Sequence, residues 1–176
     1  EKYFYPLSEK ELNDKKFIKY KETMLRKREK DFILFYNARN IKRKMVGDII
    51  LAYNQFCSLL PEEKAKKCLL LMHTTPIDQH GTHLPNLIRE LCTHGDVAFS
   101  DQKISPEALN MLYNIADVTI LISSNEGFGL SGAESIMSGT PIILNVTGGM
   151  QDQCGFKISD KHITYKDYGE IGSLHE

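Results

Sequence analysis

Apolar runs alternate with helical patterns along most of this chain of 176 residues. The runs occupy residues 32–36, 68–73, 96–99, 118–123 and 141–146, and the helical patterns occupy residues 45–60, 84–91, 106–116 and 132–138. This alternation predicts parallel strands joined by right-handed helical crossovers. The nearly continuous apolar character of the runs fits strands that are buried on both faces. The predicted fold class is therefore α/β, with a doubly wound, mainly parallel sheet.

The first thirty residues differ from the rest, because they are rich in charge and poor in apolar side chains. Ser8 and Glu11 have the spacing of a capping box, which predicts the start of a helix. We expect a charged helix to run from there toward Arg28, with a solvated face rather than a nucleic-acid recognition surface. Residues 1–30 are therefore predicted to be a helical or linker segment. Residues 31–176 are predicted to form one domain, shortened at its C-terminal end, and the chain to be a piece of a longer protein.

Composition and charge exclude several classes of protein. The net charge of −1 gives no global field that would attract nucleic acid or a membrane. The sequence has neither a signal peptide nor an apolar run of about 18 residues, so we expect a cytoplasmic chain without a transmembrane segment. The four cysteines lack the spacing of metal ligands, which predicts free thiols. His80 and His83 near Asp78 lack a third firm ligand, so we expect no metal.

The strongest chemical signal follows the fourth apolar run, where Glu126 and Glu134 lie on either side of a glycine-rich turn. Gly127 and Gly129 allow the backbone to approach a ligand closely. A helix that starts near Ser131 would direct unpaired N–H groups and its dipole toward an anion, most often a phosphate. A carboxylate beside a phosphate needs a partner, and sugar hydroxyls are one. The turn therefore suggests a ligand that carries both phosphate and sugar.

Two other interpretations of the turn remain open. Residues 127–132 satisfy G-x-G-x-x-G, the fingerprint of dinucleotide sites, although that fingerprint normally opens a fold and this turn follows the fourth run. Ser131 and Glu134 also have capping-box spacing, so Glu134 has a purely structural alternative.

Two cations follow the first apolar run. Arg39 and Lys44 are five residues apart in the loop after residues 32–36. Ligands of doubly wound sheets bind beyond the carboxyl ends of the strands, so this loop and the glycine turn belong at the same edge. Arg39 could bind a phosphate through the planar set of N–H donors on its guanidinium, and Lys44 could bind one through the single charge of its ammonium group.

Together these motifs resemble the donor-binding domain of the family 4 retaining glycosyltransferases, which have the two-domain GT-B architecture. The resemblance rests on the E-x7-E pair, on the arginine and lysine after the first run, and on residues 104–118 and 134–150. It covers about residues 32–152. It implies that the sheet is a Rossmann-like nucleotide-sugar-binding domain and one half of a GT-B enzyme.

The resemblance also implies a role for each motif. Arg39 and Lys44 would neutralise the diphosphate of a nucleotide sugar, where the leaving group develops charge. Glu126 would be the catalytic carboxylate that contacts the transferred hexose, and Glu134 would bind the ribose hydroxyls. The loop that contains Ile104 would hold the base. The remaining donor-binding residues are those of the turn: Gly127, Phe128, Gly129, Leu130 and Ser131.

The implied activity is transfer of a hexose from a UDP-sugar or GDP-sugar to an acceptor with retention of configuration, without a metal or other cofactor. A sugar, lipid-linked or protein acceptor would bind to an N-terminal domain outside this chain, and peripheral membrane association could arise through the same domain. The chain by itself is expected to be inactive. The alternatives are a GT-B epimerase, a phosphorylase, and a non-catalytic nucleotide-binding or scaffold domain.

Overall fold

The computed structural model describes residues 2–158 and 163–165. Five parallel strands form one sheet in the order β3-β2-β1-β4-β5. The strands are β1 (Phe32–Asn37), β2 (Cys68–His73), β3 (Asp96–Phe99), β4 (Val118–Leu121) and β5 (Ile142–Leu144). A separate antiparallel pair consists of β6 (Phe156–Ile158) and β7 (Ile163–Tyr165). The order of the strands reverses between β1 and β4, which is where ligands of such sheets bind.

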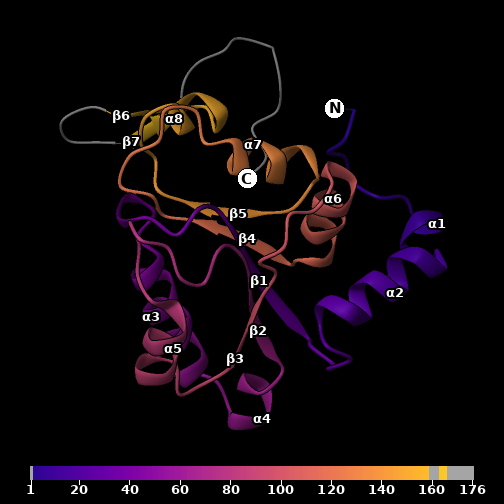
Figure 1. The fold of residues 1–176 in the computed structure, drawn as a ribbon. Helices are drawn as coiled ribbons and strands as arrows, with labels where there is room; N and C mark the ends of the chain where they lie inside the picture. The colour runs from indigo at the N-terminus through magenta and orange to yellow at the C-terminus, as the bar shows by residue number, and fades with distance from the viewer. Residues whose placement is uncertain (1, 159–162, 166–176) are drawn as a thin grey trace.

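Helices cover both faces of the sheet, as predicted for a doubly wound fold. Figure 1 shows α3 and α5 on one side of β1–β3, and α2 and α6 on the other. The helical elements of the described residues are α1 (Glu9–Leu12), α2 (Lys15–Met24), the 3-10 turn η1 (Lys42–Lys44), α3 (Val46–Ser58), α4 (Glu62–Ala65), α5 (Leu84–Leu91), α6 (Pro106–Ile115), α7 (Leu130–Met137) and α8 (Met150–Gln153).

The central strand β1 supplies side chains to two separate cores. Successive side chains of a strand point to opposite faces, so Leu34 and Tyr36 pack on the side of α3 and α5, and Ile33 and Phe35 pack on the side of α2 and α6. All four are buried. This explains why the run is continuously apolar in the sequence.

The N-terminal segment differs from the single predicted helix. Ser8 and Glu11 form the predicted capping box at the start of α1, but a second cap follows, because the Asp14 side chain accepts a hydrogen bond from the Lys16 N–H at 2.7 Å. The segment is therefore two helices. Phe17, Tyr20 and Met24 pack into the core beside α6, so α2 is part of the packed domain.

Two smaller expectations concern membranes and thiols. No helix among residues 2–158 and 163–165 has the length and apolar character needed to cross a bilayer. All four cysteines are free thiols, as predicted; Cys57 and Cys68 are buried, and Cys92 and Cys154 are half-buried.

Candidate functional site

The loops after β1 and β4 lie side by side at the carboxyl edge of the sheet. Since β1 and β4 pair in parallel, their carboxyl ends lie at the same edge (Figure 1). The backbone N–H of Ser124 donates to the carbonyl of Arg43 at 2.8 Å, and Arg43 Nη1 donates to the carbonyl of Asn125, also at 2.8 Å. Residues that are about eighty positions apart in the sequence are thus tied into one structural unit.

Glu126 occupies the centre of this unit. Its side chain is 5% exposed and forms ion pairs with Lys44 and with Arg43, whose Nη1 lies 3.0 Å from Oε2. Burial by itself would raise the pKa of Glu126, but the contacts of Lys44, Ser123 and Arg43 together outweigh it and hold the pKa below its ordinary value. Glu126 is therefore a buried carboxylate that is kept ionised by two cations.

A sharp reversal of the backbone places Lys44 beside Glu126. Met45, which has a left-handed φ of 54°, caps the end of the 3-10 turn η1 and the start of α3. Lys42 and Arg43 remain exposed on the turn, whereas Lys44 is buried. The sequence predicted Arg39 and Lys44 as the cations of this loop, and the structure brings Lys44 and the neighbouring Arg43 to Glu126.

Arg39, the other predicted cation, has a different partner. Its guanidinium forms a two-point contact with the Asp78 carboxylate, with distances of 2.8 Å and 3.3 Å. The Asp78 side chain also accepts a hydrogen bond from the His80 N–H at 2.9 Å. The Arg39 hydrogen bond, followed by the one from His80, holds the pKa of Asp78 below its ordinary value. The structure brings Lys44 to Glu126 and leaves Arg39 paired with Asp78.

Glu134 lies on α7 in a neutral environment. Its Oε2 accepts hydrogen bonds from the hydroxyl of Tyr113 at 2.8 Å and from the Asn37 side chain at 3.2 Å. Burial raises the pKa of Glu134, and the Tyr113 hydrogen bond offsets this only in part. The capping-box interpretation is wrong, because Gly129 is the N-cap of α7 and the Ser131 hydroxyl donates to the Asn37 carbonyl at 2.5 Å. The carboxylate of Glu134 is held instead by groups from β1 and α6.

The glycine turn has a specific shape. Gly127 has open space where a side chain would project, whereas Gly129 has a left-handed φ of 81° and Met150 fills the place of its missing side chain. Helix α7 begins at Leu130, one residue before the predicted start. Phe128 and Leu130 are exposed by 57% and 68%. The turn therefore presents main chain at Gly127 and two apolar side chains to the solvent.

Ile104, predicted to lie near the base, is half-buried between β3 and α6. Its side chain packs against the core on the α6 side of the sheet, while its neighbours Gln102 and Lys103 are exposed. The structure thus gives Ile104 a packing role and leaves the outer part of this loop open.

Four contacting residues were not predicted: Asn37, Arg43, Asp78 and Tyr113. Arg43 adjoins Lys44, and Asn37 ends the first strand, so their positions in the sequence could have drawn attention to them. Asp78 and Tyr113 come from other loops and helices, and only the tertiary structure brings them to the site.

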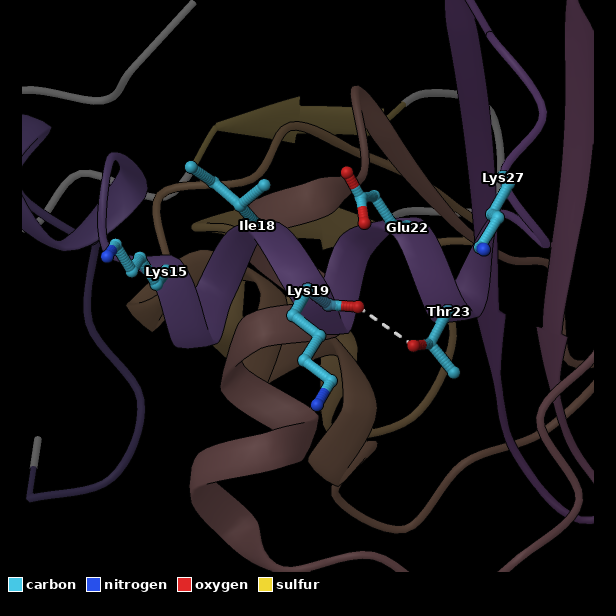
Figure 2. Close-up of a pocket in the computed structure, with 6 residues that line it drawn as sticks. All are labelled: Lys15, Ile18, Lys19, Glu22, Thr23 and Lys27. Atoms are coloured by element: carbon cyan, nitrogen blue, oxygen red, sulfur yellow. Dashed lines mark hydrogen bonds between the residues drawn. The ribbon is translucent and has the colours of Figure 1, made fainter.

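A pocket on α2 and the turn after it lies outside these loops. It is lined by Lys15, Ile18, Lys19, Glu22, Thr23 and Lys27 (Figure 2). Figure 2 shows the lysines spread along the helix rather than directed at one point, and the Thr23 hydroxyl donating to the Lys19 carbonyl. The pocket has no carboxylate–cation unit like that around Glu126.

Comparison with known proteins assigns the chain to a family. Residues 11–163 match the family described as "Family 4 Glycosyltransferase in conflict systems". The chain belongs to this family. The predicted family resemblance is therefore confirmed, and so is the Rossmann-like fold, which is also that of solved glycosyltransferases.

Three proteins show the extent of the similarity in sequence or in fold. Mannosylfructose-phosphate synthase of Agrobacterium fabrum is 30% identical over 104 residues, which are 57% of this chain and 23% of the relative. Sucrose-phosphate synthase of Thermosynechococcus elongatus superposes with a TM-score of 0.62 at 26% identity, over 87% of this chain and 34% of that one. HepE of Anabaena, solved in complex with UDP-glucose, gives a TM-score of 0.59 at 17% identity, over 80% of this chain and 36% of that one. The chain spans about a third or less of the length of the first two relatives.

Proposed function

We propose that this chain is the donor-binding half of a retaining glycosyltransferase, which transfers a hexose from a nucleoside diphosphate sugar to an acceptor. One observation carries the proposal: in a family 4 chain, Glu126 lies beside two cations at the strand-order reversal of a parallel sheet. Such an edge is where nucleotides bind in these folds. The acceptor would bind to a second, N-terminal domain.

The cations suit the leaving group of this reaction. Departure of a nucleoside diphosphate leaves negative charge on its phosphates, and preorganised donors at that point give the largest gain in rate. Lys44 would exchange Glu126 for a phosphate oxygen, and the N-terminus of α7 would add a partial positive charge. Because side-chain cations and the helix supply this charge, we propose that the donor is held without a metal.

The two acids would take different parts of the donor. Once Lys44 has turned to the phosphate, the Glu126 carboxylate would keep Arg43 as its partner and could face the hexose, where it would stabilise an oxocarbenium-like transition state. Glu134 would accept hydrogen bonds from the ribose hydroxyls. The open space at Gly127 supports close approach of the sugar and the distal phosphate to the main chain, and the exposed part of the loop before Ile104 would hold the base.

The relatives support an activated sugar as the donor. HepE was solved with UDP-glucose, and the names of the two synthases state that they form sugar-phosphate products. We therefore propose a UDP-sugar or a GDP-sugar for this chain, with retention of configuration at the transferred carbon.

Binding of nucleotides tests the proposal. Thermal shift and calorimetric titration with UDP, GDP, UDP-glucose and GDP-mannose should show stabilisation that grows with ligand concentration above the Kd. Lys44→Ala should abolish this stabilisation, whereas Lys42→Ala, on the same turn but exposed, should leave it unchanged. Absence of binding by the unaltered chain to all four compounds would refute the proposal, and an unchanged Kd in Lys44→Ala would refute the assignment of the phosphate site.

A further inference from the structure

The positive charge of this chain is concentrated in one segment. Residues 15–30 hold eight lysines and arginines and two acids, a net charge of +6, whereas the other 160 residues carry −7. Arg28 and Lys30 form ion pairs with Asp96, the first residue of β3. The remaining six cations of the segment lie on α2 and the turn after it, and all six are exposed. The net charge of −1 for the whole chain therefore conceals a local positive field.

One face of α2 presents part of this charge as a row. Lys15 and Lys19 are about one helical turn apart, Lys27 lies on the turn after the helix, and Figure 2 shows the three lysines spread along α2. Among residues 2–158 and 163–165, none of the three forms an ion pair with a carboxylate. Glu22 is the acid among the described residues that line the same hollow, whose volume is about 450 Å³. The row therefore keeps an excess of positive charge on a hollowed surface.

The backbone after α2 brings Lys27 to this row through a strained turn. Arg26 and Lys27 have left-handed φ angles of 52° and 55°, at a helix end where glycine is favoured. The Lys27 N–H donates to the Glu22 carbonyl at 2.7 Å, which folds the chain back against the last turn of the helix. Two long cationic side chains thus occupy positions that glycine would adopt without strain. Strained positions of this kind cluster at functional sites.

The surroundings of α2 favour a nucleic acid over a membrane as the partner of this face. Phe17, Tyr20 and Met24 pack into the core, so the apolar face of the helix is not available for insertion into a bilayer. A row of cations along a hollow matches the repeating phosphates of an extended strand. Ile18, which is 44% exposed, lines the hollow as well. Its side chain offers an apolar contact to the unpaired bases of a single strand, whereas a duplex keeps its bases stacked and paired.

We infer that this face of α2 binds single-stranded nucleic acid, with Lys15, Lys19 and Lys27 on successive phosphates and Ile18 against a base. The surface is separate from the loops around Glu126, and its role does not depend on the proposed function. The sequence alone predicted a solvated face for this segment. The structure adds that three of its cations are aligned along one hollow and unpaired.

Fluorescence anisotropy of the full chain with a labelled oligothymidylate of about 20 nucleotides tests the inference. Three phosphate contacts on a single strand predict that the logarithm of the association constant falls against the logarithm of the salt concentration with a slope of about −2. A variant that combines Lys15→Gln, Lys19→Gln and Lys27→Gln should bring this slope close to zero and weaken binding about tenfold or more at low salt.

A matched control removes the same charge from another surface. Lys64→Gln, Lys66→Gln and Lys67→Gln together alter three exposed lysines on α4 and the residues after it. Lys66 and Lys67 are already paired with Glu62 and Asp31. This variant should leave the slope at about −2. Equal losses of affinity in the two triple variants would overturn the inference, because binding would then follow net charge alone.

Lys27→Gly separates binding from folding. Glycine adopts the left-handed backbone freely, so the Tm should not fall, while the slope should become less steep by about 0.7 with the loss of one phosphate contact. An unchanged slope would overturn the place of Lys27 on the surface. Circular dichroism and Tm show whether each variant folds. If the triple variant of α2 does not fold, Lys19→Gln decides the question by the same change of about 0.7.

Competing partners complete the test. Tighter binding to a duplex of the same length, to polyglutamate or to vesicles that contain phosphatidylglycerol would overturn the assignment to a single strand. Absence of binding to the oligothymidylate would overturn it as well. Saturating UDP should leave the oligonucleotide bound, and displacement by UDP would place the strand at the loops around Glu126 instead. Titration with UDP in the absence of oligonucleotide tests the proposed function independently of all these outcomes.

Discussion

Glu126 and Glu134 are the same residue type, eight positions apart, in opposite electrostatic environments. Glu126 is buried among cations that hold its pKa below the ordinary value, whereas Glu134 accepts hydrogen bonds from a phenol and an amide, and burial raises its pKa. The first arrangement holds an ionised carboxylate between two cations. The second arrangement fixes the position of the Glu134 carboxyl group through two neutral hydrogen-bond donors.

Removal of Lys44 should have the greatest effect on stability. Lys44→Ala leaves the buried Glu126 with only the half-exposed Arg43, and loss of one partner from a buried ion pair costs about 3–5 kcal/mol, with the lower end expected here because Arg43 remains. Urea denaturation measures the free energy of unfolding. Adding Glu126→Gln should recover part of the loss, since no charge is then left buried alone. Simple additivity of the two losses would contradict the coupling.

Loss of the Tyr113 hydroxyl should cost less. Tyr113→Phe removes the donor to Glu134 and leaves the Asn37 amide without one of its acceptors, which predicts a loss of about 1–3 kcal/mol in urea denaturation. Tyr3→Phe, at an exposed position, is the matched control and should give no change. Equal stability of Tyr113→Phe and the unaltered chain would show that the hydroxyl network does not hold Glu134.

The two acids should respond to pH in opposite directions. The lowered pKa of Glu126 contributes stability that is present above its unfolded pKa and is lost as pH falls through the folded pKa. The raised pKa of Glu134 contributes stability that is present below its unfolded pKa and is lost as pH rises through the folded pKa. A difference of one unit between the folded and the unfolded pKa corresponds to about 1.4 kcal/mol in the free energy of unfolding.

Urea denaturation between about pH 3 and pH 7 separates the two effects. As pH rises, Glu134→Gln should gain stability relative to the unaltered chain, and Glu126→Gln should lose it. Parallel pH profiles for the two variants would show that their environments do not differ as described.

The pair of Arg39 and Asp78, whose arginine side chain is 59% exposed, should contribute least to stability. Exposed ion pairs gain little, because water screens them and two side chains must be ordered. Arg39→Gln should therefore leave the urea midpoint within experimental error of the unaltered chain, in contrast to Lys44→Ala. A clear loss of stability would show that the loop around Asp78 depends on this contact.

Much of the fold could be predicted from the sequence, because buried parallel strands and their helices leave strong local patterns. The runs at 68–73 and 96–99 and the helix at 84–91 match the observed bounds. Helix α7 starts earlier than predicted because a left-handed glycine, rather than Ser131, ends the turn. The break between α1 and α2 depends on Asp14, whose capping role a charged sequence does not make obvious.

The candidate site was predictable in its location but not in its pairing. The presence of a cationic loop and a pair of acids follows from residue types and from the rule that places strand ends at one edge. Which cation reaches which acid depends on the reversal at Met45 and on Asp78 from a distant loop. The sequence pattern therefore predicted Arg39 and Lys44, while the three-dimensional path of the loop brings Arg43 and Lys44 to Glu126.

The neighbouring positions of β1 and β4 also govern how the site comes into being. The two halves of the Glu126 cluster are separated by 82 residues, and β2, β3 and their helices lie between them in the chain. Contacts of such long range require closure of a large loop, which makes them costly in entropy and slow to form. Nucleotide binding at the proposed site would thus require the pairing of β4 with β1 to be complete.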